Sequence, residues 1–253
     1  MMRFDGKVVL VTGASRGIGA AIAQLFAEQG ARVAVHYHRS RAGAEEVAES
    51  LPGGTHFVVQ ADLADAEAVA GMVERVVRET GRIDVLVNNA GMYEDHPLAQ
   101  TDYESWQAAW RRTIDTNLIG AANASYCAAR QMIAQGGGRI VNVSSRGAFR
   151  GEPDAPAYGA SKAGMNAMGQ SLARHLAPYN IFVGTVAPGW VETDMAADTL
   201  SGPGGDEVRA QSPLGRVARP EEVAYAVLFL ASEGAEFTTG TIIDVNGASY
   251  LRT

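Results

Sequence analysis

The sequence predicts an open α/β fold in which helices cover both faces of a parallel sheet, formed by a single domain over residues 1–253. Short apolar runs alternate along the chain with longer stretches whose apolar residues recur at helical spacing. Runs that are apolar at every position are typical of parallel strands buried on both faces. No linker, repeat or low-complexity segment divides the chain. Strands that alternate with helices form βαβ units, so we expect one doubly wound sheet.

The elements follow in order from these two patterns. The first strand is the run Val8-Val9-Leu10-Val11, and a glycine turn leads from it into the first helix. The other strands are short apolar runs at residues 32–37, 57–59, 83–87, 139–143, 181–186 and 241–245. Helices are predicted at residues 18–29, 42–50, 67–79, 157–176 and 220–231, with two long helices and a break within residues 102–135.

Composition excludes several classes of function. Of the 253 residues, 47% are apolar and 19% are charged, which favours a folded core over a disordered chain. Asp and Glu number 28 against 21 Lys and Arg, and the net charge of −7 argues against binding to nucleic acid or to an anionic membrane. No apolar run reaches about 18 residues, so no membrane span is expected.

Cysteine usage and the N-terminal residues indicate a reducing compartment. Cys127 is the single cysteine, so no intramolecular disulfide forms and no CxxC metal motif exists. We expect no metal site. Residues 1–7 contain no long apolar region of the kind found in secretory signals. A cytoplasmic protein is the expectation.

The turn after the first strand is a candidate phosphate site. Its sequence is Thr12-Gly13-Ala14-Ser15-Arg16-Gly17-Ile18-Gly19, with GxxxGxG spacing. Glycines there allow backbone N–H groups to approach a pyrophosphate, and the helix N-terminus adds partial positive charge. A plain tight turn is the alternative interpretation. The candidate dinucleotide contacts are Gly13, Ser15, Arg16, Gly17, Ile18 and Gly19.

The end of the second strand bears on the choice of nucleotide. A strand end that binds NAD typically carries an acid for the ribose 2′-hydroxyl, but the run HYHRSR at residues 36–41 has no acid and two arginines. A guanidinium bonds a phosphate with two parallel N–H groups. NADP(H) is therefore preferred over NAD(H), with Tyr37, His38, Arg39 and Ser40 as candidate contacts. A solvated basic loop is the alternative.

Tyr158 and Lys162 form a candidate catalytic pair. Residues four apart share one helix face, so both side chains point into one cleft. A lysine cation stabilises a phenolate, so we expect Lys162 to lower the pKa of Tyr158 from its ordinary value of about 10. Such a Tyr can donate a proton to a carbonyl oxygen. Ser145 follows the fifth strand, where ligands bind in doubly wound sheets, although a turn serine and a surface Tyr-Lys pair are the plain alternatives. No GxSxG motif supports a serine hydrolase.

These residues, taken together, resemble the short-chain dehydrogenase/reductase family. The matching motifs occur in order over nearly the whole chain: TGASRGIG at 12–19, Asp62-Leu63, NNAG at 88–91, Asn117, Ser145, YxxxK at 158–162 and Pro188-Gly189. The resemblance implies a Rossmann-type domain with a seven-stranded parallel sheet and NAD(P) across its carboxyl edge.

The resemblance also implies roles for particular residues. Tyr158 is the expected general acid/base, Ser145 positions the substrate carbonyl, and Lys162 binds the nicotinamide ribose. Asn117 is expected to hold a water that links Lys162 to solvent. The remaining expected cofactor contacts are Asp62 and Leu63 at the adenine, Asn89, Ala90 and Gly91 at the ribose, and Pro188, Gly189, Val191 and Thr193 at the carboxamide; Asn88 is equally explained by a structural role between strands.

The pattern is closest to the 3-oxoacyl-acyl-carrier-protein reductase group. Tyr37 stands where NAD-dependent members carry Asp. Enoyl reductases of the family space Tyr and Lys further apart, so alkene reduction is disfavoured. Gly136 and Tyr179 occupy positions where carrier-dependent members offer arginines, so a small free carbonyl compound is at least as plausible a substrate. A homotetramer is also implied.

Three segments beyond the strand ends are expected to form the substrate pocket, namely residues 92–96, 146–156 and the substrate loop at about 190–215. Residues 201–205 are too rich in glycine for a stable helix, and we expect either a mobile lid or a flexible surface loop. His96 is expected to face solvent, and Trp106 and Trp110 to serve packing or subunit contact.

The sequence therefore predicts an NADP(H)-dependent oxidoreductase that transfers hydride reversibly between nicotinamide and a carbonyl or secondary alcohol. An NAD(H)-dependent dehydrogenase is the alternative within the enzymes. A nucleotide-sensing regulator without catalysis is the alternative outside them, although a sensor has no need of Asn117, Ser145, Tyr158 and Lys162 together.

Overall fold

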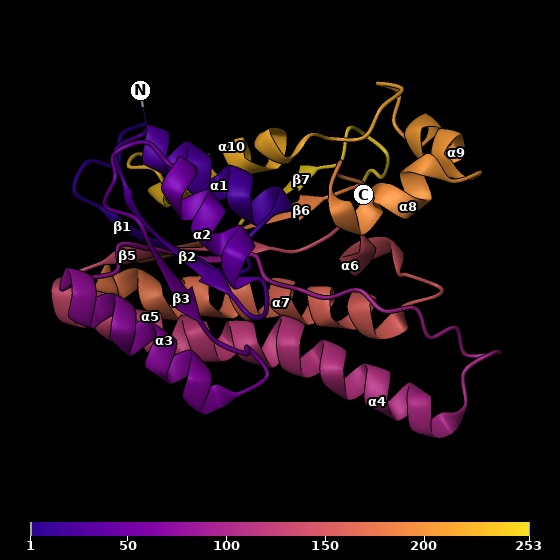
Figure 1. Cartoon of the computed structure of the whole chain (residues 1–253), viewed down its shortest axis with the longest axis horizontal. Coiled ribbons are helices and arrows are strands. Elements are labelled where there is room, and N and C mark those ends of the chain that lie inside the picture. Colours follow the sequence, from indigo (N-terminus) through magenta and orange to yellow (C-terminus); the bar gives the residue numbers. More distant parts are fainter. Residues whose placement is uncertain (1, 253) are drawn as a thin grey trace.

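The strands form one parallel sheet in the computed structural model, which describes residues 2–252 (Figure 1). The order across the sheet is β3-β2-β1-β4-β5-β6-β7, and every neighbouring pair is parallel. The strands are β1 (Val8–Val11), β2 (Arg32–Tyr37), β3 (Phe57–Gln60), β4 (Val85–Asn88), β5 (Gly138–Val143), β6 (Ile181–Pro188) and β7 (Ile242–Val245). The predicted fold class and the seven strands are confirmed.

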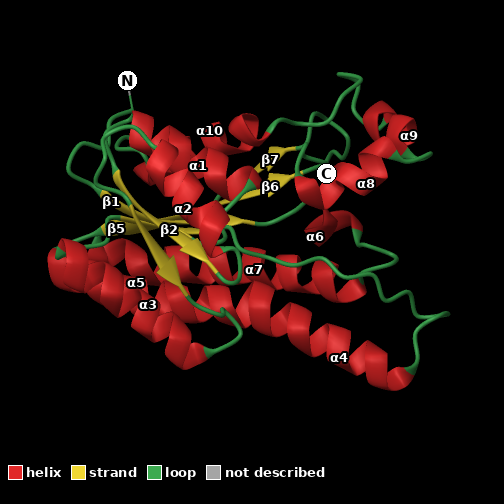
Figure 2. Cartoon of the chain, in the orientation of Figure 1, coloured by secondary structure: helices red, strands yellow, loops and turns green. Residues whose placement is uncertain are grey.

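The helices occupy the connections between strands (Figure 2). They are α1 (Gly17–Glu28), α2 (Arg41–Ser50), α3 (Ala66–Thr80), α4 (Tyr103–Ile114), α5 (Gly120–Gln135), α6 (Gly147–Arg150), α7 (Pro156–Leu176), α8 (Asp194–Ser201), α9 (Gly205–Ala210) and α10 (Pro220–Ala231), with short 3-10 turns at Ala177–Tyr179 and Glu236–Thr238. The residues at the two ends of α3 show why a helix begins and ends where it does. The Asp65 carboxylate accepts hydrogen bonds from two backbone N–H groups at the start of α3, and Gly81 ends that helix at a φ of 77°.

The sheet separates two apolar cores. Successive side chains of a strand point to opposite faces of the sheet, so each strand contributes to both cores. Val9 and Val11 of β1 pack with α1 and α10, whereas Val8 and Leu10 pack with α3 and α5. All four side chains are buried. The cores therefore cover both faces of the strand, which explains why the sequence has no polar position in this run.

Two predicted regions differ from expectation. The break expected within residues 102–135 is a π-helical segment, Asp115–Ile119, which joins α4 to α5 without interrupting the helix. The substrate loop at 190–215 contains α8 and α9, and residues 146–156 contain α6. The glycine-rich segment at 201–205 does end one helix and begin the next. An added Cβ at Gly205 would collide with the carbonyl oxygen of Leu200, so the close turn requires glycine there.

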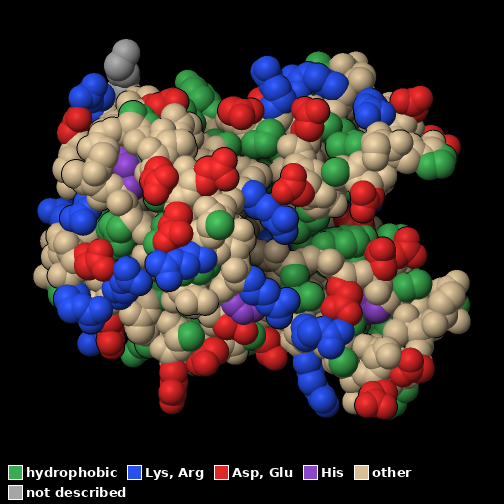
Figure 3. Space-filling model, in the orientation of Figure 1, with side chains coloured by type: hydrophobic (Ala, Val, Ile, Leu, Met, Phe, Trp, Pro, Cys, Tyr) green, Lys and Arg blue, Asp and Glu red, His purple; other side chains and the backbone are tan. Residues whose placement is uncertain are grey.

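Three short helices lie beyond the carboxyl ends of the strands. Figure 1 shows α6, α8 and α9 grouped beyond that edge of the sheet, close to the C-terminal end of the described chain. Lys and Arg are interspersed with Asp and Glu over the face in Figure 3, without a large patch of one sign. Within residues 2–252, no helix has both the length and the apolar character needed to cross a bilayer.

Candidate active site

The glycine turn is held close to the loop after β4. Thr12 Oγ1 accepts the backbone N–H groups of Asn89 and Ala90 at 2.9 and 3.0 Å, and the Asn89 amide donates to Thr12 O at 2.9 Å. An added Cβ at Gly13 would lie 2.8 Å from Ala90 Cα, and one at Gly19 would lie 2.6 Å from Asn89 Nδ2. Glycine at these two positions is therefore required for the close approach of the two loops.

The N-terminus of α1 is open to an anion. Its N-cap residue is Arg16, and no side chain caps the first turn, so the backbone N–H groups of that turn remain available. Gly17 has a φ of 55°, and its position lies against the Thr193 side chain. The Arg16 guanidinium lies 3.5 Å from the Asp194 carboxylate. The turn after β1 and the segment after β6 therefore meet here, at the turn predicted to hold a pyrophosphate.

His36 on β2 supports this turn, a role that the sequence analysis did not predict. Its side chain is 1% exposed. Nδ1 accepts the backbone N–H of Gly13 at 2.9 Å, and Nε2 lies 3.2 Å from Ala61 O, so Nε2 carries the ring proton. Burial lowers the pKa of His36 to about 4, which keeps the ring neutral. The HYH pattern in a buried strand was the available signal.

The end of β2 brings several of the predicted nucleotide contacts together. Tyr37 is buried, whereas His38, Arg39 and Ser40 are exposed. The His38 ring lies 3.5 Å from the Asp62 carboxylate, which connects the ends of β2 and β3. A Cβ at Gly43 would lie 2.8 Å from Ser40 Oγ and 3.1 Å from Ser15 O, so α2 packs closely on the glycine turn.

The arginines at this edge differ in their partners. Arg41 pairs with Glu45 at 2.8 Å on α2, and Arg16 makes the longer contact with Asp194. Arg39 has no carboxylate oxygen within 4 Å among residues 2–252. Among these three arginines, Arg39 is therefore the one whose guanidinium is most available to bind a phosphate.

Leu63 is buried beside the π-helical segment. A Cβ at Gly120 would lie 2.7 Å from Leu63 Cβ, so glycine at the start of α5 lets the chain after β3 pack against that helix. Asp62 Oδ1 accepts the backbone N–H of Ala64 at 3.0 Å and remains partly exposed at the sheet edge. Of these two predicted adenine contacts, Asp62 lies beside His38, and Leu63 is buried behind it in the chain.

Tyr158 and Lys162 lie on one face of α7, and Ser145 follows β5 opposite them. Lys162 Nζ donates to Val143 O at 2.8 Å and lies 5.7 Å from the centre of the Tyr158 ring. Burial raises the pKa of Tyr158 to about 12, while the Ser145 hydroxyl lowers it and Glu152 raises it. Burial lowers the pKa of Lys162 to about 8. The lowered Tyr158 pKa expected from Lys162 is not found, because desolvation of the phenol dominates its pKa.

Asn117 lies in the π-helical segment and connects three parts of the site. Its Oδ1 accepts the backbone N–H of Met92 at 2.8 Å, and its Nδ2 donates to Met92 O at 2.9 Å and to Ser161 Oγ at 3.2 Å. A Cβ at Gly91 would lie 3.4 Å from both Asn117 Oδ1 and Lys162 Nζ. The π turn therefore brings Asn117 next to Lys162, as a proton path would need.

Asn88 has a structural role. Its amide nitrogen donates to Ser125 Oγ on α5 and to Asn142 Oδ1 on β5, each at 2.9 Å. The side chain is 2% exposed, so it ties strand and helix together and offers no contact surface. The structural alternative noted for Asn88 is confirmed.

The segment after β6 is fixed on both sides. Gly189 donates its backbone N–H to Val245 O at 3.0 Å, and Val191 forms a parallel bridge with Ala218. A Cβ at Gly189 would lie 3.0 Å from Asn246 Cβ. Pro188 ends β6, and Val191 and Thr193 follow toward the glycine turn. The predicted carboxamide contacts therefore lie on a loop that is braced by the end of β7.

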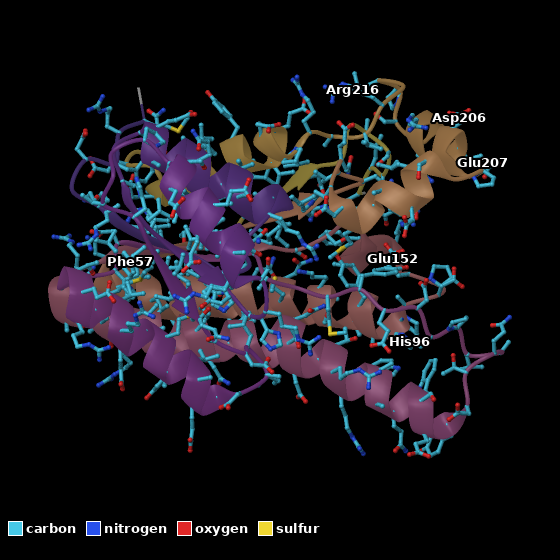
Figure 4. The ribbon with its side chains drawn as sticks, in the orientation of Figure 1. Phe57, His96, Glu152, Asp206, Glu207 and Arg216 are labelled. Carbon is cyan, nitrogen blue, oxygen red and sulfur yellow. The ribbon has the colours of Figure 1, made fainter. Side chains whose placement is uncertain are left out.

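His96 does not face solvent, which corrects the sequence expectation. It is 2% exposed, its ring packs edge-on against Trp106 at 5.3 Å, and Nε2 accepts the backbone N–H of Ala157 at 3.3 Å. Nδ1 lies 2.7 Å from Glu94 O, so Nδ1 carries the proton. His96, labelled in Figure 4, pins the loop after β4 to the start of α7, one residue before Tyr158. Trp106, the fourth residue of α4, packs as the sequence predicts, but its partner His96 was not foreseen.

Tyr93 and Glu152 lie near Tyr158. The Tyr93 ring packs edge-on against Tyr158 with centres 5.1 Å apart. Glu152, labelled in Figure 4, pairs with Arg150 at 3.4 Å, and its carboxylate lies where a Cβ at Gly147 would be. Burial, followed by the nearby Asp95, Glu152 and Asp154, raises the pKa of Tyr93 above its ordinary value. The wall beside Tyr158 is therefore aromatic and acidic. Sequence analysis identified these segments but not these side chains.

Comparison with known proteins agrees with this geometry. A family model described as enoyl-(acyl carrier protein) reductase matches residues 13–248. A 3-oxoacyl-(acyl-carrier-protein) reductase of Staphylococcus aureus is 42% identical over 247 residues, covering 97% of this chain and 98% of that protein. An uncharacterized oxidoreductase of Methylorubrum extorquens is 40% identical over 253 residues, covering 98% of this chain and 99% of the relative.

A solved structure is similar over the whole fold. A short chain dehydrogenase from Burkholderia cenocepacia, in complex with NADP, has a TM-score of 0.90 and 35% sequence identity, covering 98% of this chain and 99% of that one. Family model, relatives and fold agree with the order of motifs from the glycine turn to the Pro188-Gly189 loop. The chain is therefore an oxidoreductase of the short-chain dehydrogenase/reductase family.

Proposed function

We propose that the protein is an NADP(H)-dependent carbonyl reductase or alcohol dehydrogenase that uses Tyr158 as its general acid/base. The observation that carries the proposal is the meeting of Tyr158, Lys162, Ser145 and Asn117 beside the glycine turn. Nζ of Lys162 lies 5.7 Å from the Tyr158 ring, and Asn117 bonds to Ser161 of the same helix. A binding module has no need of this combination of a proton donor, a nearby cation and a buried amide.

Tyr158 would donate its hydroxyl proton to the carbonyl oxygen of the substrate. A pKa of about 12 keeps the hydroxyl protonated at neutral pH, and this form is the one that reduction of a carbonyl needs. The Ser145 hydroxyl would donate a hydrogen bond to the same oxygen. Lys162, with its pKa lowered to about 8, would return a proton to Tyr158 along the path that Asn117 borders. These directions favour reduction over oxidation at neutral pH.

The chain fits a nicotinamide dinucleotide. Gly13 and Gly19 leave the space that a Cβ would fill, and the N-terminus of α1 has no side-chain cap. The first turn of α1 would hold the pyrophosphate, Asp62 and Leu63 the adenine, and Asn89, Ala90, Gly91 and Lys162 the nicotinamide ribose. Pro188, Gly189, Val191 and Thr193 would orient the carboxamide. The bound nicotinamide would supply or accept the hydride.

Preference for NADP(H) rests on the cations at the end of β2. Arg39 lacks a carboxylate partner within 4 Å among the described residues, whereas Arg41 pairs with Glu45 at 2.8 Å. We expect Arg39→Ala to weaken NADPH binding about tenfold, or about 1.4 kcal/mol, and to leave NADH binding nearly unchanged. Arg41→Ala is the matched control with a smaller expected effect. Titration of each variant with both nucleotides measures this. Equal losses for NADPH and NADH in Arg39→Ala would favour the NAD(H)-dependent alternative.

A free carbonyl compound is the preferred substrate class. Gly136 and Tyr179, where carrier-dependent relatives are expected to offer arginines, precede β5 and β6 at the amino edge of the sheet. The wall beside Tyr158 includes Tyr93 and Glu152, which suits a neutral substrate better than an anionic one. The three-residue spacing between Tyr158 and Lys162 supports carbonyl rather than alkene reduction.

A cytoplasmic homotetramer is part of the proposal. β7 is an edge strand whose outer backbone groups have no strand partner among the described residues, and Tyr126 on α5 is 68% exposed. A second copy would cover these surfaces. Sedimentation at several protein concentrations tests the assembly, and a single monomeric species at all of them would contradict it.

The deciding experiment follows NADPH oxidation with ketones, diketones, aldehydes and 3-oxoacyl thioesters, with NADH in parallel. We expect turnover of one carbonyl class with NADPH. Tyr158→Phe should lose nearly all turnover and keep its affinity for NADPH, because the substitution removes a hydroxyl and leaves the ring. A Tyr158→Phe enzyme that retains most of its activity would exclude the role of Tyr158. Tight NADPH binding without any turnover would favour a sensor.

A further inference from the structure

A cavity lies between the end of β7, the loop after β6 and the segment after α9. Its volume is about 140 Å³, and its lining includes Arg146, Trp190, Val208, Leu214, Val245 and Ser249. No residue that lines it belongs to the predicted catalytic or cofactor set. It adjoins the candidate active site, because Arg146 directly follows Ser145, Trp190 lies between Gly189 and Val191, and both belong to segments expected to form the substrate pocket.

Arg146 is a buried cation with neutral partners. It is 3% exposed, and its guanidinium donates to Ser249 Oγ and to Gln211 Oε1, each at 2.6 Å. No carboxylate oxygen of residues 2–252 lies within 4 Å of it. A guanidinium has more N–H donors than these two bonds use. Buried charges in proteins are ordinarily paired, since desolvation of a lone charge is costly.

The other charges at this cavity are already paired. Arg216, labelled in Figure 4, contacts Glu222 at 2.7 Å, and Asp244 contacts Arg252 at 2.7 Å. Burial lowers the pKa of Arg146, and the neighbouring Arg150 acts in the same direction, while Glu152 opposes them. Glu152 itself is bound by Arg150. The positive charge of Arg146 therefore has no anion of its own in the described chain.

Trp190 supplies an independent observation. Its indole nitrogen is buried and has no hydrogen-bond partner. An indole N–H can only donate, so an acceptor is required to satisfy it. The same cavity therefore has one unsatisfied indole N–H and one guanidinium without an anion, from separate segments, together with apolar surface from Val208, Leu214 and Val245.

We propose that this cavity binds a small carboxylate, whose oxygens accept hydrogen bonds from Arg146 and Trp190 while a short apolar tail contacts the valine and leucine side chains. A planar carboxylate matches the fork of a guanidinium, and one negative charge balances the one unpaired cation. Gln211 directly follows α9, and Ser249 follows β7, so both partners of Arg146 belong to segments that border the cavity. A bound carboxylate would therefore fix α9 against the sheet.

The test measures thermal unfolding with acetate or propionate against chloride at equal ionic strength, in a buffer free of carboxylates. We expect either carboxylate to raise the Tm of the wild type by about 3 °C at roughly ten times its Kd, with propionate effective at lower concentration. Arg146→Met should abolish this shift. Trp190→Phe, which keeps the aromatic ring and removes the N–H, should raise the Kd severalfold.

Arg139→Met is the matched control. Arg139 lies at the other end of β5, is largely buried, and is paired with Glu236 at 2.6 Å. Its loss should lower the Tm but leave the carboxylate response intact. An equal shift from chloride and acetate, or an unchanged response in Arg146→Met, would overturn the proposal. Should Arg146→Met fail to fold, an undiminished response in Trp190→Phe would also overturn it. Because the readout is stability, it is independent of the proposed reaction.

Discussion

Two buried histidines hold opposite halves of the candidate site, and they do so with opposite ring nitrogens. His36 accepts the Gly13 N–H on Nδ1 and donates from Nε2 to Ala61 O. His96 accepts the Ala157 N–H on Nε2 and donates from Nδ1 to Glu94 O. His36 thus fixes the glycine turn of the cofactor half, and His96 fixes the start of α7, next to Tyr158, in the substrate half.

The two histidines differ in how firmly the segment that carries each ring is held. His36 belongs to β2, whose neighbours β1 and β3 are hydrogen-bonded to it along their length. His96 belongs to a loop outside any strand, held nearby by the bond from its own N–H to Asp154 O at 2.7 Å and by the partly exposed ion pair of Glu94 with Arg112 at 2.6 Å. Loss of the His36 bonds therefore leaves buried groups that cannot move to water, whereas the loop of His96 can relax. We expect the two positions to respond differently to the same substitutions.

The largest effect is expected from His36→Ala. The substitution leaves the Gly13 N–H and the Ala61 carbonyl without partners in a buried position, at about 1–3 kcal/mol for each group. We expect a loss of about 4 kcal/mol in the free energy of unfolding and an increase of about tenfold in the Kd for NADPH, because the glycine turn is no longer held. Urea unfolding and nucleotide titration measure the two quantities.

Two amide variants, whose acceptor oxygens lie at different distances from the backbone, test whether the Gly13 hydrogen bond positions the cofactor. Asn carries its acceptor oxygen on Cγ, where His has Nδ1, so His36→Asn should restore most of the NADPH affinity. His36→Gln places the acceptor one bond further out and should not. Equal affinities in the Asn and Gln variants would mean that the Gly13 hydrogen bond does not position the cofactor.

The second effect is a dependence of stability on pH. The pKa of His36 falls from an ordinary 6.5 to about 4 in the folded chain, mainly through burial, with His38 lowering it and the Ala61 carbonyl and Asp62 raising it. Between these values the unfolded chain binds a proton that the folded chain does not, so stability falls as the pH falls from 6.5 toward 4. From pH 7 to pH 5 this loss is about 2 kcal/mol.

His36→Asn removes the titrating ring and provides the comparison. Urea unfolding at pH 7 and pH 5 should show a loss in the wild type that exceeds the loss in His36→Asn by about that amount. Identical pH dependence in the two proteins would mean that the ring of His36 is not desolvated in the folded state.

The cofactor half was largely predictable from the sequence because its requirements are local. The apolar run of β1 and the glycines of residues 12–19 each specify their own geometry through periodicity or missing Cβ atoms. YxxxK similarly predicts that Tyr158 and Lys162 share a helix face, which α7 confirms. Family resemblance then ordered these pieces around one sheet edge.

The substrate half was less predictable because its contacts join segments far apart in the chain. His96 became buried through Trp106 and Ala157, and neither contact has a spacing that a sequence pattern could reveal. The lowered pKa expected for Tyr158 is not found because burial, a property of the whole fold, raises it. The π turn at Asn117 depends on packing against α7 and likewise left no sequence signal beyond the break in periodicity.

The smallest effect is expected at His96, and it should appear in catalysis rather than in nucleotide binding. His96→Ala leaves the Ala157 N–H without a partner at the first turn of α7, one residue before Tyr158. The 3.3 Å bond is long and the loop can relax, so we expect kcat/KM for the carbonyl substrate to fall about fivefold, or about 1 kcal/mol, with an unchanged Kd for NADPH.

The amide variants that restore function at His96 should be the reverse of those at His36. His96→Gln reaches the position of Nε2 and should recover kcat/KM, while His96→Asn should not. Recovery by Asn rather than Gln, or a larger change in NADPH affinity than in kcat/KM, would contradict the assignment of His96 to the substrate half.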